Sequence, residues 1–226
     1  MRSRHVFLVL SILATLLFQM NHPVHSFAGS YVYMTYEDLV ILPAHLLFFL
    51  PYVLLALASS ERAISLLENR ALIQSRLSGR KEYADQVMKV LLKDMVVYGI
   101  LHVSVIFVLS LVTRSFSLGV FELQVFIRTI ILHASMQVLL LVLSTLMQRS
   151  TALMTWFAVM SVISSAGLME LHRLMPFFYR FNLFVSCMMV DDRIYAGWLA
   201  IVLWTIALVV MLFIARVSIM KGESHD

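Results

Sequence analysis

Three histidines lie within long apolar runs of the sequence, and an imidazole can ligate haem, relay a proton or bind a metal. They are His45, His102 and His133. An ionisable side chain inside a bilayer is costly, which makes each of the three a candidate functional residue. His45 and His133 start from the same side of the membrane at depths of roughly 9 and 12 Å, so they are the pair that could share a haem or a proton. Neutral histidines that hydrogen-bond between helices are the simpler interpretation.

Signatures of other chemistry are missing from the sequence. It contains no G-x-x-x-x-G-K-[ST] phosphate loop, no H-E-x-x-H zinc-protease pair and no G-x-S-x-G nucleophile elbow. Ser164-Ser165-Ala166-Gly167 resembles an intramembrane serine-protease motif only loosely, and a small-residue patch for helix packing explains it better. A single cysteine, Cys187, excludes an intrachain disulfide and any multi-cysteine metal site. We therefore predict a chain that is not an enzyme and that holds no catalytic residue, metal or cofactor.

Length and composition restrict the elements that can carry these residues. The chain has 226 residues, of which 61% are hydrophobic and 13% charged, and its mean hydropathy is +0.90. Because soluble domains average about half apolar and a quarter charged residues, the sequence predicts an all-α polytopic membrane protein. Six spans leave no room for a soluble catalytic domain, so residues 1–226 are predicted to form a single transmembrane domain. The predicted spans are residues 6–20, 39–58, 95–113, 125–147, 152–169 and 196–215.

The first span has a second interpretation. Its apolar run follows Arg2 and Arg4, and the small residues Ser26 and Ala28 would also suit a signal-peptide cleavage site. We favour a retained first span over a cleaved signal in residues 1–28. Cleavage would leave five spans, with the orientation of everything downstream unchanged.

Basic residues predict the orientation of the chain. With both termini inside, 12 of the 17 Lys and Arg residues fall in the N-terminus, residues 61–94, the turn at Arg149 and the C-terminus. Short cytoplasmic loops are enriched in these residues. We therefore expect a multi-pass protein of a bacterial cell membrane with both termini in the cytoplasm. The same bias explains the formal net charge of +4 without a nucleic acid partner.

Two segments outside the spans have patterns of their own. Residues 61–94 are polar, and apolar residues recur at helical spacing on both sides of Ser78-Gly79, which predicts two cytoplasmic amphipathic helices. Residues 171–193 are too apolar for open water and too charged to cross a bilayer. They predict an amphipathic hairpin in the outer interface, with an irregular loop as the alternative.

Several polar residues are predicted near the outer ends of the fourth and fifth spans. Arg128 lies where a long side chain can extend to the lipid headgroups. The fifth span is the least apolar, which makes it the best candidate for a helix interface or a substrate path. Arg173 lies one helical turn beyond Glu170 and is its expected ion-pair partner. The candidate path residues are Ser161, Ser164, Ser165 and Glu170.

The order of these parts resembles a known family. The layout resembles that of the permease subunits of ATP-binding-cassette transporters of the type-2 exporter class. The shared parts are a short inward N-terminus, six spans, a long basic cytoplasmic segment after the second span and an amphipathic outer hairpin. The closest local match is Glu68-Asn69-Arg70, followed by Ser75-Arg76-Leu77-Ser78-Gly79-Arg80-Lys81-Glu82-Tyr83 and by Lys89. This run resembles the one before the third span in many Gram-positive permeases, with Tyr83 where such runs often carry tryptophan.

The resemblance implies that this chain works with other subunits. In that family the cytoplasmic segment docks in a groove of a separate ATPase subunit, which would hold ATP and Mg²⁺. A second permease copy, identical or not, would enclose the pathway within the lipid bilayer. The cargo would be amphipathic, such as a peptide antibiotic or a lipid, and the role would be export or immunity. Carried over by position, the coupling residues would be Glu68, Arg70, Arg76, Arg80 and Lys81.

Two functions of other classes remain alternatives. A membrane-embedded haem-binding or redox subunit would use the intramembrane histidines. A membrane sensor or immunity protein would bind its ligand without transporting it. Co-purification with an ATPase would favour the permease, whereas a haem absorption band would favour the redox subunit.

Overall fold

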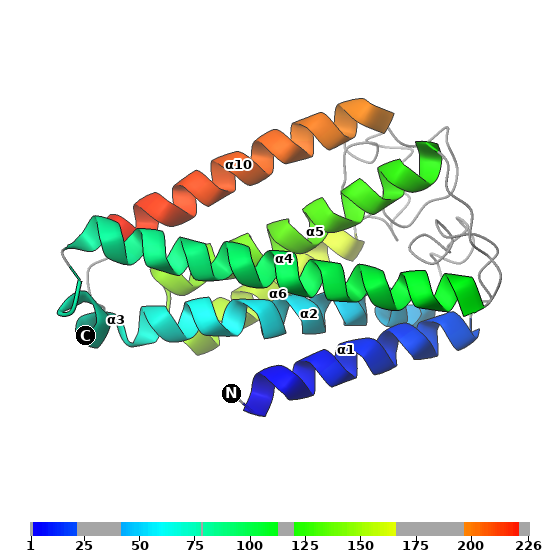
Figure 1. Ribbon diagram of the computed structural model, residues 1–226, viewed down its shortest axis with the longest axis horizontal. Coiled ribbons are helices and arrows are strands. Elements are labelled where there is room, and N and C mark those ends of the chain that lie inside the picture. The colour runs from blue at the N-terminus through cyan, green and yellow to red at the C-terminus, as the bar shows by residue number, and fades with distance from the viewer. Residues whose placement is uncertain (1, 22–41, 78, 113–119, 166–196, 222–226) are drawn as a thin grey trace.

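The computed structural model describes residues 2–21, 42–77, 79–112, 120–165 and 197–221. Within these ranges the chain forms seven helices (Figure 1), which confirms the predicted all-α class. The helices are α1 (Arg2–Asn21), α2 (Leu42–Glu68), α3 (Arg70–Gln74), α4 (Arg80–Val112), α5 (Val120–Leu146), α6 (Arg149–Ser165) and α10 (Gly197–Lys221).

Three of the described helices contain segments long and apolar enough to cross a bilayer, namely Leu50–Glu68, Phe126–Leu146 and Trp198–Lys221. They indicate a multi-pass membrane protein. The second and third of these segments correspond to the fourth and sixth predicted spans, whereas Leu50–Glu68 overlaps the second predicted span at residues 50–58 and extends into residues predicted to be cytoplasmic. The first and third predicted spans and residues 152–165 of the fifth are helical, in α1, α4 and α6, but their described residues do not meet that criterion. The predicted hairpin at 171–193 lies outside the described residues.

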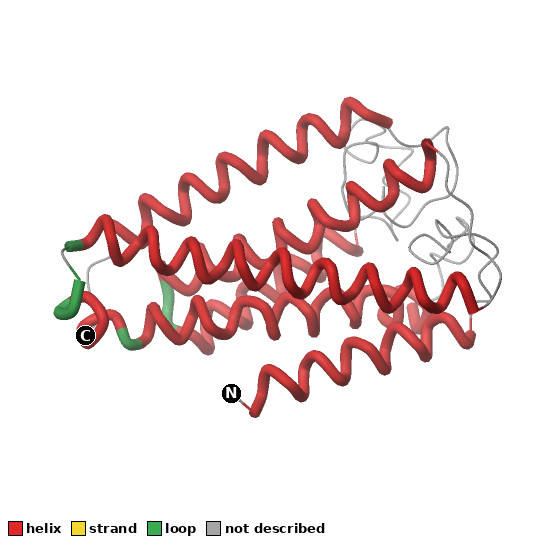
Figure 2. The backbone as a smooth tube through the Cα atoms, viewed as in Figure 1, coloured by secondary structure: helices red, strands yellow, loops and turns green. Residues whose placement is uncertain are grey.

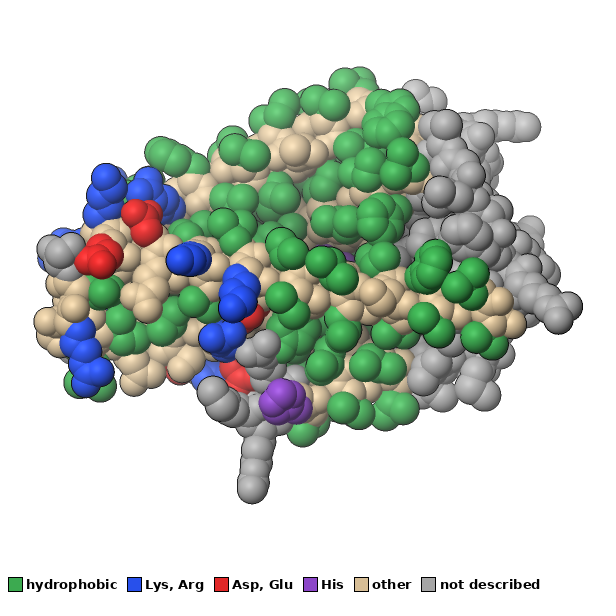
Figure 3. Space-filling model, viewed as in Figure 1, with side chains coloured by type: hydrophobic (Ala, Val, Ile, Leu, Met, Phe, Trp, Pro, Cys, Tyr) green, Lys and Arg blue, Asp and Glu red, His purple; other side chains and the backbone are tan. Residues whose placement is uncertain are grey.

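Helix α5 lies at the centre of the bundle. It contacts α2, α4, α6 and α10, while α1 lies against α2, and the long helices run roughly along the same axis (Figure 2). Leu132, Leu140 and Leu141 of α5 are fully buried. The indole Nε1 of Trp156 donates a 2.9 Å hydrogen bond to the carbonyl oxygen of Met136, which fixes α6 against α5. Exposed apolar side chains are spread along the described helices on the face shown in Figure 3, as expected where lipid replaces water.

Charged side chains gather at one end of the bundle, around α3 and the neighbouring ends of α2, α4 and α10 (Figure 3). The helices predicted within residues 61–94 are extensions of α2 and α4 joined through the short α3. At 33 residues, α4 is about 50 Å long, whereas the hydrocarbon core of a bilayer is about 30 Å thick. The predicted break at Ser78-Gly79 is confirmed, because Gly79 separates α3 from α4 with a φ of +156°, which other residues rarely adopt.

Candidate functional site

A buried aromatic and imidazole cluster joins α2, α4 and α5. The ring of His133 stacks on Tyr52 with centroids 4.6 Å apart and meets the edge of His102 with centroids 5.0 Å apart. Tyr52 and His102 are also in contact, at 5.5 Å. All three side chains are buried. The cluster therefore holds one residue from each of the three inner helices in mutual contact.

The described histidines pair across α4 and α5, where His102 lies against His133. The sequence singled out His45 and His133 as the pair at similar depth, and the side chain of His45 lies outside the described residues. The antiparallel course of α4 and α5 explains this pairing (Figure 1). His102 lies ten residues before the end of α4 and His133 thirteen residues after the start of α5, so both reach a similar depth from the connection.

Four polar side chains are buried along α5, namely Gln124, Arg128, His133 and Gln137. Gln124 and Arg128 are one helical turn apart, as are His133 and Gln137, but the two pairs lie on roughly opposite faces of the helix. Arg128 has no exposed surface, and its Nη2 donates to the side-chain oxygen of Gln124 at 3.2 Å. The expectation that Arg128 extends to the headgroups is therefore wrong, because its side chain turns into the bundle.

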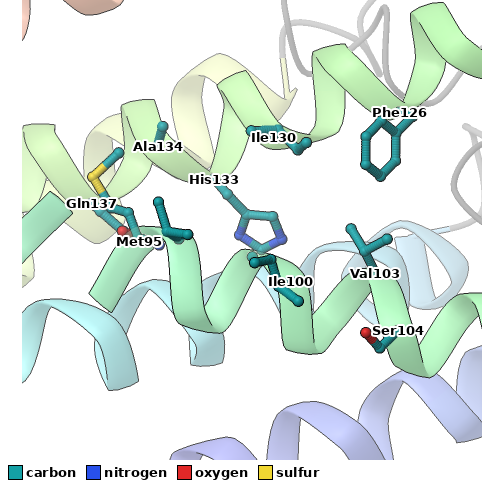
Figure 4. A pocket seen from close by; sticks show the side chains of 11 residues that line it. Met95, Ile100, Val103, Ser104, Phe126, Ile130, His133, Ala134 and Gln137 are labelled. Carbon is teal, nitrogen blue, oxygen red and sulfur yellow. The ribbon is translucent and has the colours of Figure 1, made fainter. Parts of the chain in front are cut away.

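A cavity of about 300 Å³ lies between α4 and α5, beside His133 and Gln137. His133 points into it from α5 towards α4 (Figure 4). Its polar lining residues are Ser104, His133 and Gln137, and none of the described residues that line it is charged. The remaining walls are mostly aliphatic, formed by residues such as Met95, Val103, Ile100 and Ile130. The arrangement is that of a ligand pocket with an apolar wall and a few polar groups.

The predicted substrate path lies elsewhere. Ser161 is exposed on α6, and no residue of α6 lines the cavity between α4 and α5. Ser164 and Ser165 end α6, but their side chains, like the whole of Glu170, lie outside the described residues. Sequence reasoning missed Gln137 and Gly99 as lining residues. The four-residue interval between His133 and Gln137 is a signal that could have pointed to Gln137, because residues one helical turn apart share a face.

The predicted coupling residues all lie at the charged end. Glu68 closes α2 and forms an ion pair with Arg149 at the start of α6, with 3.0 Å between the nearest atoms. Arg70 begins α3, where its Nε donates to the side-chain oxygen of Gln74 at 3.2 Å. Its guanidinium also lies 5.6 Å from the centroid of the Tyr83 ring. Two of the five predicted residues thus bind partners within the chain.

Tyr83 fixes the start of α4 against α2. Its ring is fully buried, and its hydroxyl donates a 2.9 Å hydrogen bond to the carbonyl oxygen of Leu66. Burial raises the pKa of Tyr83 to about 12, and the positive charge of Arg70 opposes that shift. Tyr83 is therefore an anchor between α2 and α4.

The other three coupling residues face outward. Arg76, Arg80 and Lys81 are exposed, and their side chains make no ion pair or hydrogen bond with the residues that the structure describes. Further along α4, Asp85 pairs with Arg216 of α10 at 2.8 Å. The charged end is thus braced to α6 and α10, while these three predicted coupling residues face outward.

No family model, curated protein or solved structure matches this chain. Its function must therefore be inferred from its own residues. Within the described part of the chain, no group of three or more His, Cys, Asp or Glu residues could hold a metal ion. The two arrangements that could serve a function are the charged end and the cavity beside His133.

Proposed function

We propose that this chain is the membrane-spanning permease subunit of an ATP-binding-cassette transporter of the type-2 exporter class. It crosses the bacterial cell membrane six times, with both termini and the charged end in the cytoplasm. A separate ATPase subunit docks on the charged end and supplies the energy of ATP hydrolysis. A second permease copy, identical or not, completes the pathway, and the cargo is an amphipathic molecule such as a peptide antibiotic or a lipid.

The observation that carries this proposal is the braced, cationic end of the bundle. α4 and its partner α2 extend past the length a bilayer requires, and α3 joins them at the tip (Figure 1). Tyr83, the Glu68–Arg149 pair and the Asp85–Arg216 pair hold this extension in place. A rigid surface with Arg76, Arg80 and Lys81 facing outward suits a partner with a complementary acidic groove.

The same helix links that surface to the interior. α4 runs without interruption from Arg80, beside the predicted docking surface, to His102 and on to Val112. A displacement of its cytoplasmic end by an ATPase would therefore move the wall of the cavity. A continuous helix can transmit a rigid-body motion of this kind.

The geometry of the histidines favours the permease over a haem subunit. Two axial histidines of one haem bind its iron from opposite faces of the macrocycle. His102 and His133 instead touch each other, and Tyr52 stacks on His133. This packing supports a structural role for the pair.

A sensor or immunity protein without transport activity would share the bundle but would bind no ATPase.

Affinity purification of the full-length chain from its native membrane tests this proposal. We expect an ATPase with a Walker motif to co-purify and to hydrolyse ATP in the eluate. Charge reversal by Arg80→Glu with Lys81→Glu is expected to reduce ATPase recovery at least about tenfold without changing the yield of the permease.

Lys89→Glu with Lys93→Glu is the matched control, because it makes the same change of charge at exposed positions further along α4. This control should retain the ATPase. Recovery of the ATPase with the Arg80 and Lys81 variant at the level of the unmodified chain would refute docking at these residues. Purification without any ATPase would favour the sensor.

A further inference from the structure

The cavity between α4 and α5 opens on the outer apolar surface of the bundle. Val96 and Ile100 of α4 line it and are 59% and 62% exposed, and Ile130 of α5 lines it on the opposite side. These side chains belong to the surface that hydrocarbon tails would cover in a bilayer. A molecule dissolved in the membrane can therefore enter between the two helices without passing through water.

Two buried polar side chains lie in this cavity. His133 is 5% exposed and Gln137 1% exposed. Neither ring nitrogen of His133 nor the side-chain oxygen of Gln137 has a hydrogen-bond partner among the described residues. Buried polar atoms are costly when they lack a partner, so rotation of these side chains to meet a polar group in the cavity would be favourable.

We propose that this cavity binds an uncharged amphiphile with a hydroxyl head group and a single hydrocarbon chain. The ligand hydroxyl donates to the side-chain oxygen of Gln137 and accepts from the N–H of His133. The two residues are one helical turn apart, at about 6 Å between their Cβ atoms, so one hydroxyl can reach both. The absence of charged residues from the lining excludes an ionised head group, which would have no counter-charge there.

Size and shape agree with a chain of moderate length. The volume of about 300 Å³ is about twice that of an engineered cavity that holds benzene. Gly99 widens the apolar part, since a Cβ atom placed there would have no heavy atom within 4 Å. The hydrocarbon chain of the ligand can therefore lie along α4 past Gly99 and leave towards the lipid.

Photo-labelling of the full-length protein in lipid nanodiscs tests the proposal without ATP or an ATPase. The probe is decan-1-ol with a diazirine in its chain and a terminal alkyne. We expect saturable labelling of the cavity residues on α4 and α5, competed by unmodified decan-1-ol. The methyl ether of the same probe, which cannot donate to Gln137, should bind about three- to tenfold more weakly.

Variants separate the polar contact from the apolar space. Gly99→Leu fills the cavity and should abolish labelling by both probes, whereas Val97→Leu, on the exposed face of the same helix, should change neither. Gln137→Met should lower labelling by the alcohol to the level of the ether and leave the ether unchanged. Thermal unfolding of each variant shows that it is folded.

Three labelling results would overturn the proposal. The first is that the Gly99→Leu variant is still labelled, and the second is that labelling spreads evenly over the lipid-facing surface of α10. The third is that the alcohol and the ether label the protein equally. Complete disulfide cross-linking of two chains through Ile130→Cys, in a Cys187→Ser background, would also overturn it by showing that a second copy covers the cavity. The site does not depend on the proposed transport activity, so loss of ATPase binding and loss of labelling are separate outcomes.

Discussion

His102 of α4 and His133 of α5 lie edge to face in the middle of the bundle, with ring centroids 5.0 Å apart. Tyr52 of α2 contacts both rings and completes a junction of three helices. Interactions of this kind matter in a membrane, because the hydrophobic effect contributes little to the association of helices that are already in lipid. The junction therefore determines how α2, α4 and α5 are placed around the neighbouring cavity.

Removal of the tyrosine ring should loosen this junction. We expect Tyr52→Ala to lower the free energy of unfolding by about 3 kcal/mol, because it deletes a buried aromatic side chain and its two ring contacts. Denaturant titration in mixed micelles measures the change. Phe213→Ala removes an aromatic ring from the lipid-facing side of α10 and should cost about 0.5 kcal/mol or less. Equal costs for the two variants would show that the junction contributes no stability.

The ion pair between Arg62 and Asp94 should show strong coupling. The shortest distance in the pair is 3.3 Å, and the side chain of Asp94 is 2% exposed whereas that of Arg62 is 47% exposed. Arg62→Ala leaves a buried carboxylate without this partner and should cost about 2–3 kcal/mol, while Arg62→Ala combined with Asp94→Asn should recover much of that loss.

The pair of Arg216 with Asp85 is the matched control for the buried ion pair. Both of its side chains are at least a third exposed, so Arg216→Ala should cost about 1 kcal/mol or less. A double-mutant cycle on each pair gives the coupling energies. A coupling energy for Arg62 and Asp94 no larger than that for Arg216 and Asp85 would contradict this prediction.

Stability should fall at alkaline pH through Tyr83. Its pKa is raised from 10.0 to about 12 in the folded chain, so folding favours the protonated hydroxyl. This contribution is complete below pH 10 and is lost as the pH rises through about 12. The difference in absorbance at 295 nm between the unmodified chain and Tyr83→Phe should titrate with a midpoint near pH 12. A midpoint near pH 10 would mean that the hydroxyl is accessible to water.

Thiol labelling in intact cells tests the predicted orientation. A membrane-impermeant maleimide should react with the native Cys187, which lies in the predicted outer hairpin, and Cys187→Ser should abolish the signal. In that background a cysteine introduced by Ser78→Cys should react only after the cells are opened. Reaction at position 78 in intact cells would reverse the proposed topology.

The helices and the charged end were largely predictable from the sequence. Long apolar runs without interruption predicted the helices around Leu132 and Ala207, and the Ser78-Gly79 break predicted the end of the segment that contains α3. The Lys and Arg pattern also grouped Arg149 and Arg216 with residues 61–94, and the ion pairs of the two arginines confirm that they lie together.

The neighbours of each helix were not predictable in the same way. A helix that is apolar on all sides gives little indication of which face turns inward, because lipid is as apolar as the protein interior. The sequence therefore placed His102 only within a span and Arg128 only by its depth. The structure places His102 against His133 of α5, and it buries Arg128 beside Gln124 of its own helix. The four-residue interval between His133 and Gln137 carried information about a shared helix face.

Site-specific cross-linking at the charged end tests the central claim most directly. A photo-reactive amino acid at position 76 of the full-length chain, activated in native membranes, reports which protein lies next to that surface. The proposed function predicts cross-links to a Walker-motif ATPase from position 76 and none from position 213, which faces lipid on α10. Cross-links from position 76 to lipid or to other proteins, with no ATPase among them, would contradict the account.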